Sequence, residues 1–163
     1  MTGVSRSVLI EEAHKILQIP LRELGYEFDP SNHDGWGHFR FEKKMQQPVT
    51  MFYVIEFQPR GFHSEDDLFD TAVNLYRSTS RERYKLGKPI KGGPEQIWSL
   101  RLNPHLWGGT WTRSMEDEWW HFLSAEEVEI AYKDILEKLK KYGIPFLEDP
   151  KSTFSSGLGL EKV

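Results

Sequence analysis

The fold is decided by residues 38–58, which read HFRFEKKMQQPVTMFYVIEFQ. Apolar and polar side chains alternate through the first part of this stretch, and β-branched and aromatic residues dominate the second part. Alternation with a period of two and this composition are typical of β-strands. Strands are therefore predicted at 38–44 and 49–58, and the short link between them favours an antiparallel hairpin over a crossover helix.

Further strands are predicted at 67–76 and 96–102, with shorter ones at 109–113 and 118–122. Successive side chains of a strand point to opposite faces, so the alternation also predicts the two faces of the sheet. The apolar face, expected to lie under helices, carries Phe39, Phe41, Phe69, Val73, Leu75, Trp98, Leu100 and Leu102. The opposite face carries Arg40, Glu42, Glu56, Gln58, Asp70, Asn74, Ser99 and Arg101. Strand 49–58 is apolar on both faces for most of its length, which predicts a central position.

A helical pattern precedes the strands. Apolar residues recur every three or four positions from Ser5 to Leu24, as one buried face of a helix requires. Pro20 lies inside this pattern and predicts a kink or two shorter helices, because proline removes a backbone donor and clashes with the preceding turn. Gly25 is the expected end of the helix.

A second helix follows the strands. Ser124 and Glu127 have the spacing of a capping box, which satisfies free backbone donors at a helix start. The helix is expected to run to Tyr142 and to end at Gly143 and Pro145. These elements predict an α+β fold, with an antiparallel sheet of about five or six strands and N- and C-terminal helices packed on one face. Residues 1–150 are expected to form a single domain, and 151–163 a flexible C-terminal tail.

Composition limits the function. The chain has 163 residues and a formal net charge of −4, so it has no global attraction to nucleic acid or to an anionic membrane. It has no cysteine, which excludes disulfides, cysteine zinc sites and thiol nucleophiles and fits a reducing compartment. No apolar stretch suits a signal peptide or a membrane span. A cytoplasmic protein without a cofactor is therefore expected.

Charge is unevenly distributed along the chain. Residues 77–91 hold six basic residues and one acid, a local charge of +5, and residues 116–137 hold eight acids and one lysine, a local charge of −7. Oppositely charged segments attract each other in low salt. The chain is therefore expected to be a monomer or to self-associate weakly. No nucleic-acid module accompanies the basic segment.

Six short motifs resemble a widespread bacterial domain-of-unknown-function family, the one numbered 4304. They are LRELGYEF at 21–28, FRF at 39–41, IEFQ at 55–58, FDTAVNL at 69–75, EWW at 118–120 and YGIPFL at 142–147. Together they span most of residues 16–148. The resemblance implies an α+β domain and no known activity, so it assigns no catalytic residue.

The candidate binding site lies in an aromatic segment. Five of the six tryptophans fall between residues 98 and 120, where indole rings form either a bulky core or a stacking surface. Trp98 and one of Trp119 and Trp120 are expected in the core. The loop at residues 107–113 offers indole faces and the planar guanidinium of an arginine, which suit a planar or anionic ligand group. The predicted ligand-binding residues are Arg101, His105, Trp107, Trp111 and Arg113.

Two interpretations of the function stay open. The favoured one is a non-catalytic binding or interaction module, with the open sheet face and residues 107–113 as the recognition surface for a protein partner or a small planar or anionic ligand. The alternative is a small hydrolase-like enzyme that uses Glu56 or Asp70 with Arg101. Cross-strand ion pairs of these carboxylates with Arg40 and Arg101 are the favoured explanation of those charges. His33, Asp34 and His38 have ligand chemistry but lie in a Gly-rich turn, so no metal is expected.

Overall fold

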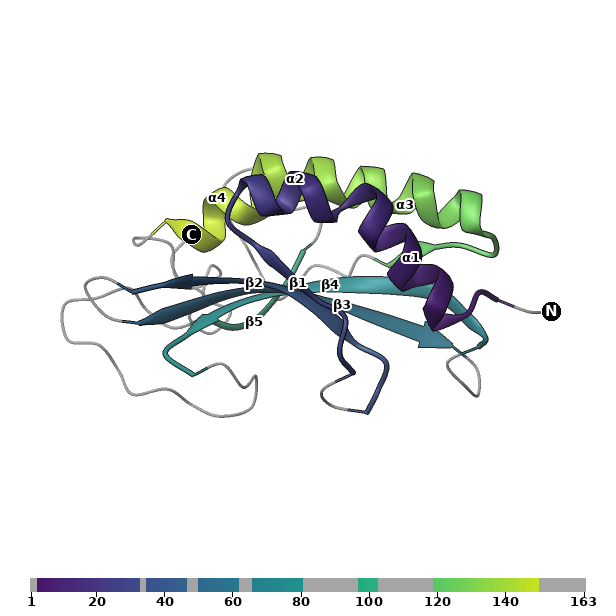
Figure 1. Cartoon of the computed structure of the whole chain (residues 1–163), viewed down its shortest axis with the longest axis horizontal. Coiled ribbons are helices and arrows are strands. Elements are labelled where there is room, and N and C mark those ends of the chain that lie inside the picture. The colour runs from purple at the N-terminus through teal and green to yellow at the C-terminus, as the bar shows by residue number, and fades with distance from the viewer. Residues whose placement is uncertain are drawn as a thin grey trace, which may run out of the picture.

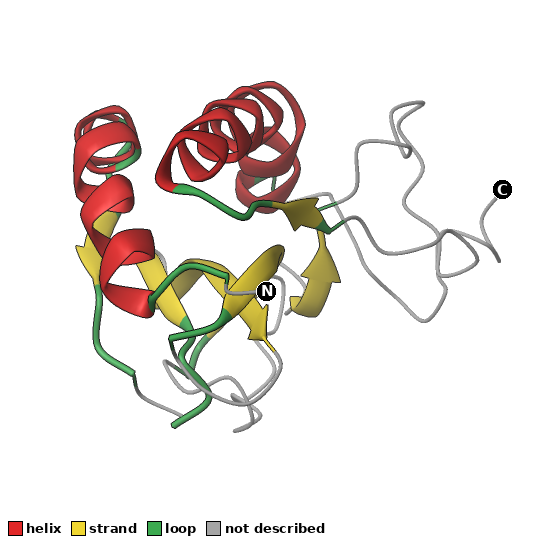
Figure 2. Cartoon of the chain, turned by 90° about the vertical axis from the view of Figure 1, so that its right-hand side faces the viewer, coloured by secondary structure: helices red, strands yellow, loops and turns green. Residues whose placement is uncertain are grey.

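The fold is a single layer of strands with helices on one side. The computed structural model describes residues 3–32, 35–46, 50–61, 66–80, 97–102 and 119–149. Helices α1 and α3 lie side by side above an antiparallel sheet, and both cover the same face of it (Figure 1, Figure 2). The predicted α+β class, with N- and C-terminal helices on one sheet face, is confirmed.

The sheet is antiparallel throughout. Its strands are β1 (Glu27–Asp29), β2 (Phe39–Met45), β3 (Met51–Gly61), β4 (Leu68–Ser78), β5 (Ile97–Arg101) and β6 (Trp120–His121). The first five follow one another in space, and β6 pairs with β4. The long predicted strands and the central place of β3 are confirmed. Strand β1 was not predicted, and the expected strand at 109–113 lies outside the described residues, as does the tail at 151–163.

The N-terminal helix consists of two pieces, as predicted, α1 (Arg6–Ile16) and α2 (Gln18–Glu23). The break is at Leu17, so Pro20 falls in the first turn of α2, where its missing N–H leaves no bond unmade. Gly25 has φ +95° and ends α2 with a Schellman pair of bonds: its N–H reaches Arg22 O, and the next N–H, of Tyr26, reaches Leu21 O.

The C-terminal helix begins as predicted but ends later. Helix α3 (Ala125–Lys138) starts at Ser124, whose Oγ accepts from Glu127 N–H. The prediction that Gly143 and Pro145 end the helix is wrong. A π-helical turn at Leu139–Gly143 leads directly into α4 (Ile144–Glu148). Pro145 has no backbone N–H to donate to the preceding turn, and the wider π-helical turn accommodates this missing hydrogen bond.

Gly143 allows close packing and does not end the helix. Its φ of −66° is an ordinary helical value. A Cβ at this position would lie 3.1 Å from Leu102 Cδ1 and 3.2 Å from Leu75 Cδ1, tighter than ordinary contact. The glycine therefore lets the helical chain approach β4 and the residue after β5 closely.

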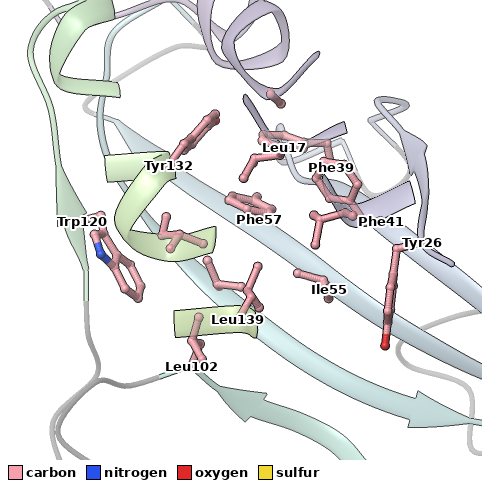
Figure 3. Close-up of a cluster of buried hydrophobic side chains, with 14 of the residues drawn as sticks. Leu17, Tyr26, Phe39, Phe41, Ile55, Phe57, Leu102, Trp120, Tyr132 and Leu139 are labelled. Atoms are coloured by element: carbon pink, nitrogen blue, oxygen red, sulfur yellow. The ribbon is translucent and has the colours of Figure 1, made fainter. Parts of the chain in front are cut away.

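The core lies between the sheet and the helices and is built from aromatic rings (Figure 3). Phe57 is at its centre. Its ring stacks on Phe39 at 5.0 Å and meets Phe41 and Tyr132 edge-on at 5.9 and 5.4 Å. The face assignment is confirmed for Phe39, Phe41, Val73, Leu75 and Leu102, all of which belong to this core.

Three tyrosines of the core make the stability of the fold depend on pH in the alkaline range. Burial raises the pKa of Tyr26, Tyr132 and Tyr53 above the ordinary value, and Glu148 beside Tyr26 adds to the rise for that residue. In the unfolded chain these tyrosines ionise at about pH 10. Below that pH all three are neutral in both states, so they leave stability independent of pH. Above it the unfolded chain loses the protons first, so each tyrosine lowers stability by up to about 1.4 kcal/mol per pH unit until the pH reaches its own raised pKa in the folded chain.

Urea unfolding between about pH 9 and 12 measures this fall. Tyr26→Phe is expected to make the fall less steep, since one titrating group is gone. A free energy of unfolding that stays level through this range would contradict the assignment.

Candidate functional site

The predicted site residues divide into two groups. His105, Trp107, Trp111 and Arg113 lie outside the described residues. Arg101 is the last residue of β5, on the polar side of the sheet, and is partly buried. What surrounds Arg101 is therefore the part of the predicted site that the structure describes.

The polar face of the sheet is more buried than predicted. Glu56 is 5% exposed, and Asp70 and Asn74 are fully buried. The expectation of an open face is wrong at these positions. Buried polar groups are tolerated when they bond to one another, and these side chains do so.

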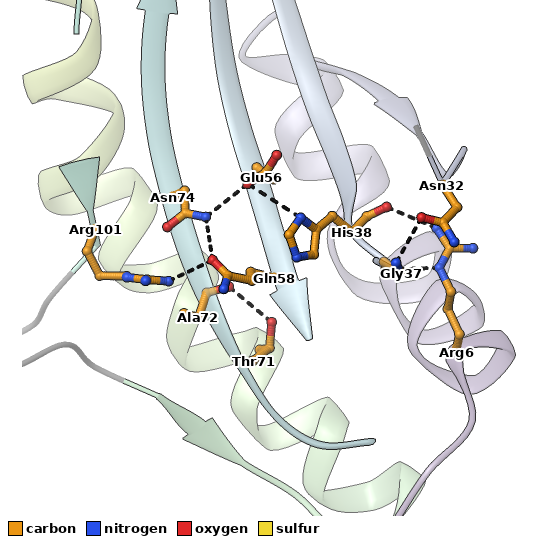
Figure 4. Close-up of polar contacts among 10 residues, drawn as sticks. All are labelled: Arg6, Asn32, Gly37, His38, Glu56, Gln58, Thr71, Ala72, Asn74 and Arg101. Atoms are coloured by element: carbon orange, nitrogen blue, oxygen red, sulfur yellow. Dashed lines mark hydrogen bonds and ion pairs between the residues drawn. The ribbon is translucent and has the colours of Figure 1, made fainter. Parts of the chain in front are cut away.

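A chain of side-chain contacts crosses three strands (Figure 4). Asn74 Nδ2 donates to Glu56 Oε1 and to Gln58 Oε1, each at 2.9 Å. Arg101 Nη1 donates to the same Gln58 oxygen at 3.0 Å, and His38 Nδ1 lies 3.9 Å from Glu56 Oε1. Asn74 and Gln58 together therefore link the buried Glu56 carboxylate to Arg101, and the bond from Gln58 helps to hold the guanidinium in place.

A second arginine lies beside this chain of contacts. Arg60 binds Asp70 with both prongs of its fork, Nε to Oδ1 at 3.1 Å and Nη2 to Oδ2 at 2.6 Å. The Asp70 carboxylate is fully buried, whereas the Arg60 side chain is 51% exposed. His121 Nδ1 lies 3.5 Å from the same Asp70 oxygen, and its side chain is 73% exposed. The buried carboxylate thus holds a solvent-facing guanidinium in one orientation.

The ring of Trp119 contacts both arginines. The Arg60 Cζ atom lies 4.1 Å from the centre of its ring and the Arg101 Cζ atom 5.1 Å, both within the range of cation–π attraction. The next residue, Trp120, is 7% exposed and belongs to the core, where its Nε1–H donates to Asp134 Oδ2 at 2.7 Å. The expectation that one of these two tryptophans is core is confirmed. Arg60, Trp119 and Arg101 are called the arginine–tryptophan cluster below.

The cluster has the chemistry of an anion site. Within the described part of the chain, Arg60 Nη1 makes no hydrogen bond, so its two N–H groups are available to a ligand. Trp119 already receives two guanidinium groups, which leaves less of its ring for a planar ligand. The arrangement therefore suits a carboxylate or a phosphate better than a stacked ring.

The carboxylates of the catalytic alternative are already bound by other side chains, Glu56 by Asn74 and Asp70 by Arg60. Asp70 is bound through both oxygens by Arg60, and Arg101 contacts Gln58 rather than either carboxylate in the hydrogen bonds described above. Among the described residues, no three His, Asp or Glu side chains form a group able to hold a metal ion. His33 and Asp34 lie outside that part of the chain.

Sequence reasoning missed Arg60 and the role of Trp119. The pairing of Arg60 with Asp70 depends on strand register, which no single segment reveals. The predicted strand at 118–122 did indicate that Trp119 and Trp120 point to opposite faces, but two identical side chains do not reveal which of them is buried.

No protein-family model, curated protein or solved structure matches the chain. Nor does any helix in the described part reach the length and apolarity needed to cross a membrane.

Proposed function

We propose that this chain is a non-catalytic binding module whose arginine–tryptophan cluster recognises a carboxylate or phosphate group of its ligand or partner. The observation that carries the proposal is the placement of two guanidinium groups, Arg60 and Arg101, against the single ring of Trp119. Membership of family 4304 and a cytoplasmic location, the latter from the cysteine-free composition, are part of the same proposal.

Preorganisation supports this role. Asp70 holds Arg60 by two hydrogen bonds, Gln58 holds Arg101 by one, and Trp119 lies against both. A ligand that meets side chains already fixed in place loses less binding energy to ordering them. Each charge-assisted hydrogen bond to a fixed guanidinium contributes about 1.5 to 3 kcal/mol, roughly a tenfold to hundredfold gain in affinity.

Binding of inorganic phosphate and of citrate in low salt tests the proposal by titration calorimetry. Arg101→Gln is expected to weaken binding at least about tenfold, because it removes a charged donor and leaves the Asp70–Arg60 pair intact. Arg60→Gln combined with Asp70→Asn is expected to do the same without leaving an unpaired buried carboxylate.

Lys133→Gln is the matched control, since Lys133 is an exposed cation on α3 paired with Glu129. Its binding should equal that of the wild type, and unchanged amide spectra check that each variant folds. Equal affinities in all four proteins would refute the anion site. Hydrolysis of a phosphate ester or carboxyl ester by the wild type that is lost on Glu56→Gln would instead favour the hydrolase alternative.

A further inference from the structure

One tryptophan outside the cluster is almost fully exposed. Trp36, in the turn between β1 and β2, has a relative exposure of 79%. This turn projects on the side of the sheet away from the helices (Figure 1). An indole ring carries a large apolar surface, so its exposure on a folded protein marks a candidate contact residue.

The turn that carries Trp36 is held by other residues. Gly35 and Gly37 have φ of +78° and +84°, which side chains rarely adopt. Asn32 Oδ1 accepts from Gly37 N–H at 2.8 Å. Arg6 of α1 donates to three turn carbonyls, those of Pro30 at 2.6 Å, Gly37 at 2.9 Å and His38 at 3.2 Å (Figure 4). The backbone of the turn that carries Trp36 is thus held by Arg6 of α1 and by Asn32.

Strand register places this turn and the arginine–tryptophan cluster at the same end of the sheet. Phe39, three residues after Trp36, pairs with Phe57, and Arg60 is three residues beyond Phe57 on the antiparallel strand β3. Arg60 pairs with Asp70, which pairs with His121 on β6. Neighbouring strands lie about 4.8 Å apart, so the strands that carry or adjoin the cluster are displaced sideways by about 5 to 14 Å from β2, the strand that this turn enters.

We propose that Trp36 and the arginine–tryptophan cluster, with His121 beside it, form one docking surface for a protein that presents a carboxylate beside aliphatic side chains. The inference rests on the proposed function and names the partner class for the same site. The carboxylate binds Arg60 and Arg101, and the aliphatic groups cover the ring of Trp36.

Charge and distance select this partner. The cationic groups of the surface, Arg60 and Arg101, both contact the ring of Trp119, whereas the exposed Trp36 adds an apolar contact. A single small anion that fills the cluster does not extend across three strand spacings to the indole. Tryptophan and arginine are also the residues that most often dominate binding energy in protein interfaces.

A series of synthetic peptides tests the surface. Each peptide carries two glutamates and two leucines, separated by a Gly–Ser spacer of varied length, and is titrated against the full chain with inorganic phosphate as the reference probe. The expected optimum is a spacer of about one to four residues, because an extended residue spans about 3.3 Å. At that length the peptide should bind at least about tenfold more tightly than a diglutamate peptide.

Trp36→Ala is expected to remove that gain and to leave phosphate affinity unchanged. Ile130→Ala, which removes a 69% exposed apolar side chain from α3, should change neither. The inference is overturned if the gain survives Trp36→Ala, or if no peptide of the series exceeds diglutamate. If Arg101→Gln leaves phosphate binding intact, the proposed function itself fails, whatever the result at Trp36.

Discussion

Replacing Phe57 by alanine is expected to lower the free energy of unfolding by about 3 to 5 kcal/mol. Phe57 is fully buried on β3, the central strand, and contacts three aromatic rings contributed by β2 and α3. The loss combines the lost burial of the ring with the cavity it leaves, because neighbouring rings fixed by the sheet cannot collapse into the space.

Urea denaturation of the wild type and of Phe57→Ala measures the loss. Phe57→Leu should cost less, since leucine fills part of the cavity. Phe52→Ala is the matched control, because Phe52 is on the same strand, points to the opposite face and is only partly buried. A Phe57→Ala effect no larger than that of Phe52→Ala would contradict the position of the core.

Arg77→Met is expected to cost about 3 to 6 kcal/mol, the second large effect. Arg77 is fully buried on β4, and its Nη1 donates to Leu147 O at 2.9 Å and to Asp149 O at 2.7 Å, at the end of α4. Each hydrogen bond from a charged donor contributes about 1.5 to 3 kcal/mol. Methionine keeps the apolar volume but leaves both carbonyls without this donor, so the loss is expected even though a buried charge disappears.

Hydrogen exchange distinguishes this loss from a general weakening of the core. The backbone amides of α4 should lose protection first in Arg77→Met, because the arginine attaches α4 to the sheet. Arg77→Lys keeps the charge but has one terminal nitrogen on a shorter stem, so an intermediate loss is expected. Unchanged stability and unchanged α4 protection in Arg77→Met would show that the attachment is unimportant.

Arg77 also shows that a charge counted in the sequence can be engaged within the fold. It was counted in the basic segment 77–91, yet it is buried and bound to backbone carbonyls. On the acidic side, Glu129 pairs with Lys133, and Asp134 binds Lys138 and the Trp120 indole. Partners within the same chain therefore bind some of the charged groups of both segments. A count of charges cannot separate such groups from charges open to another molecule.

The long strands and their faces were predictable because alternation is imposed by strand geometry at every residue. The break between α1 and α2 and the cap at Ser124 were predictable for a similar reason, since proline and capping residues act locally. Strand β1 has three residues, too few for a periodic signal. The helical chain after Gly143 depends on packing against Leu75 and Leu102, which are distant in sequence.

The candidate site was predictable only in its chemistry. The sequence predicted an aromatic and arginine surface and included Arg101, because those residue types are frequent in that segment. Arg60 was missed, because its two partners, Asp70 and Trp119, come from other strands or their flanks. The burial of Asp70 and Glu56 was missed for the same reason, since burial is set by tertiary packing rather than by strand alternation.

The central claim is that Arg60, Trp119 and Arg101 bind an anion, and side-chain NMR during a phosphate titration in low salt tests it most directly. The account predicts saturable shifts of the Trp119 indole N–H and of the Arg60 and Arg101 Nε–H signals. The Trp120 indole, whose ring is buried and whose N–H donates to Asp134 on α3, should stay unchanged as an internal reference. The account would be contradicted if phosphate did not shift the Trp119 and arginine signals, or shifted them no more than the Trp120 signal.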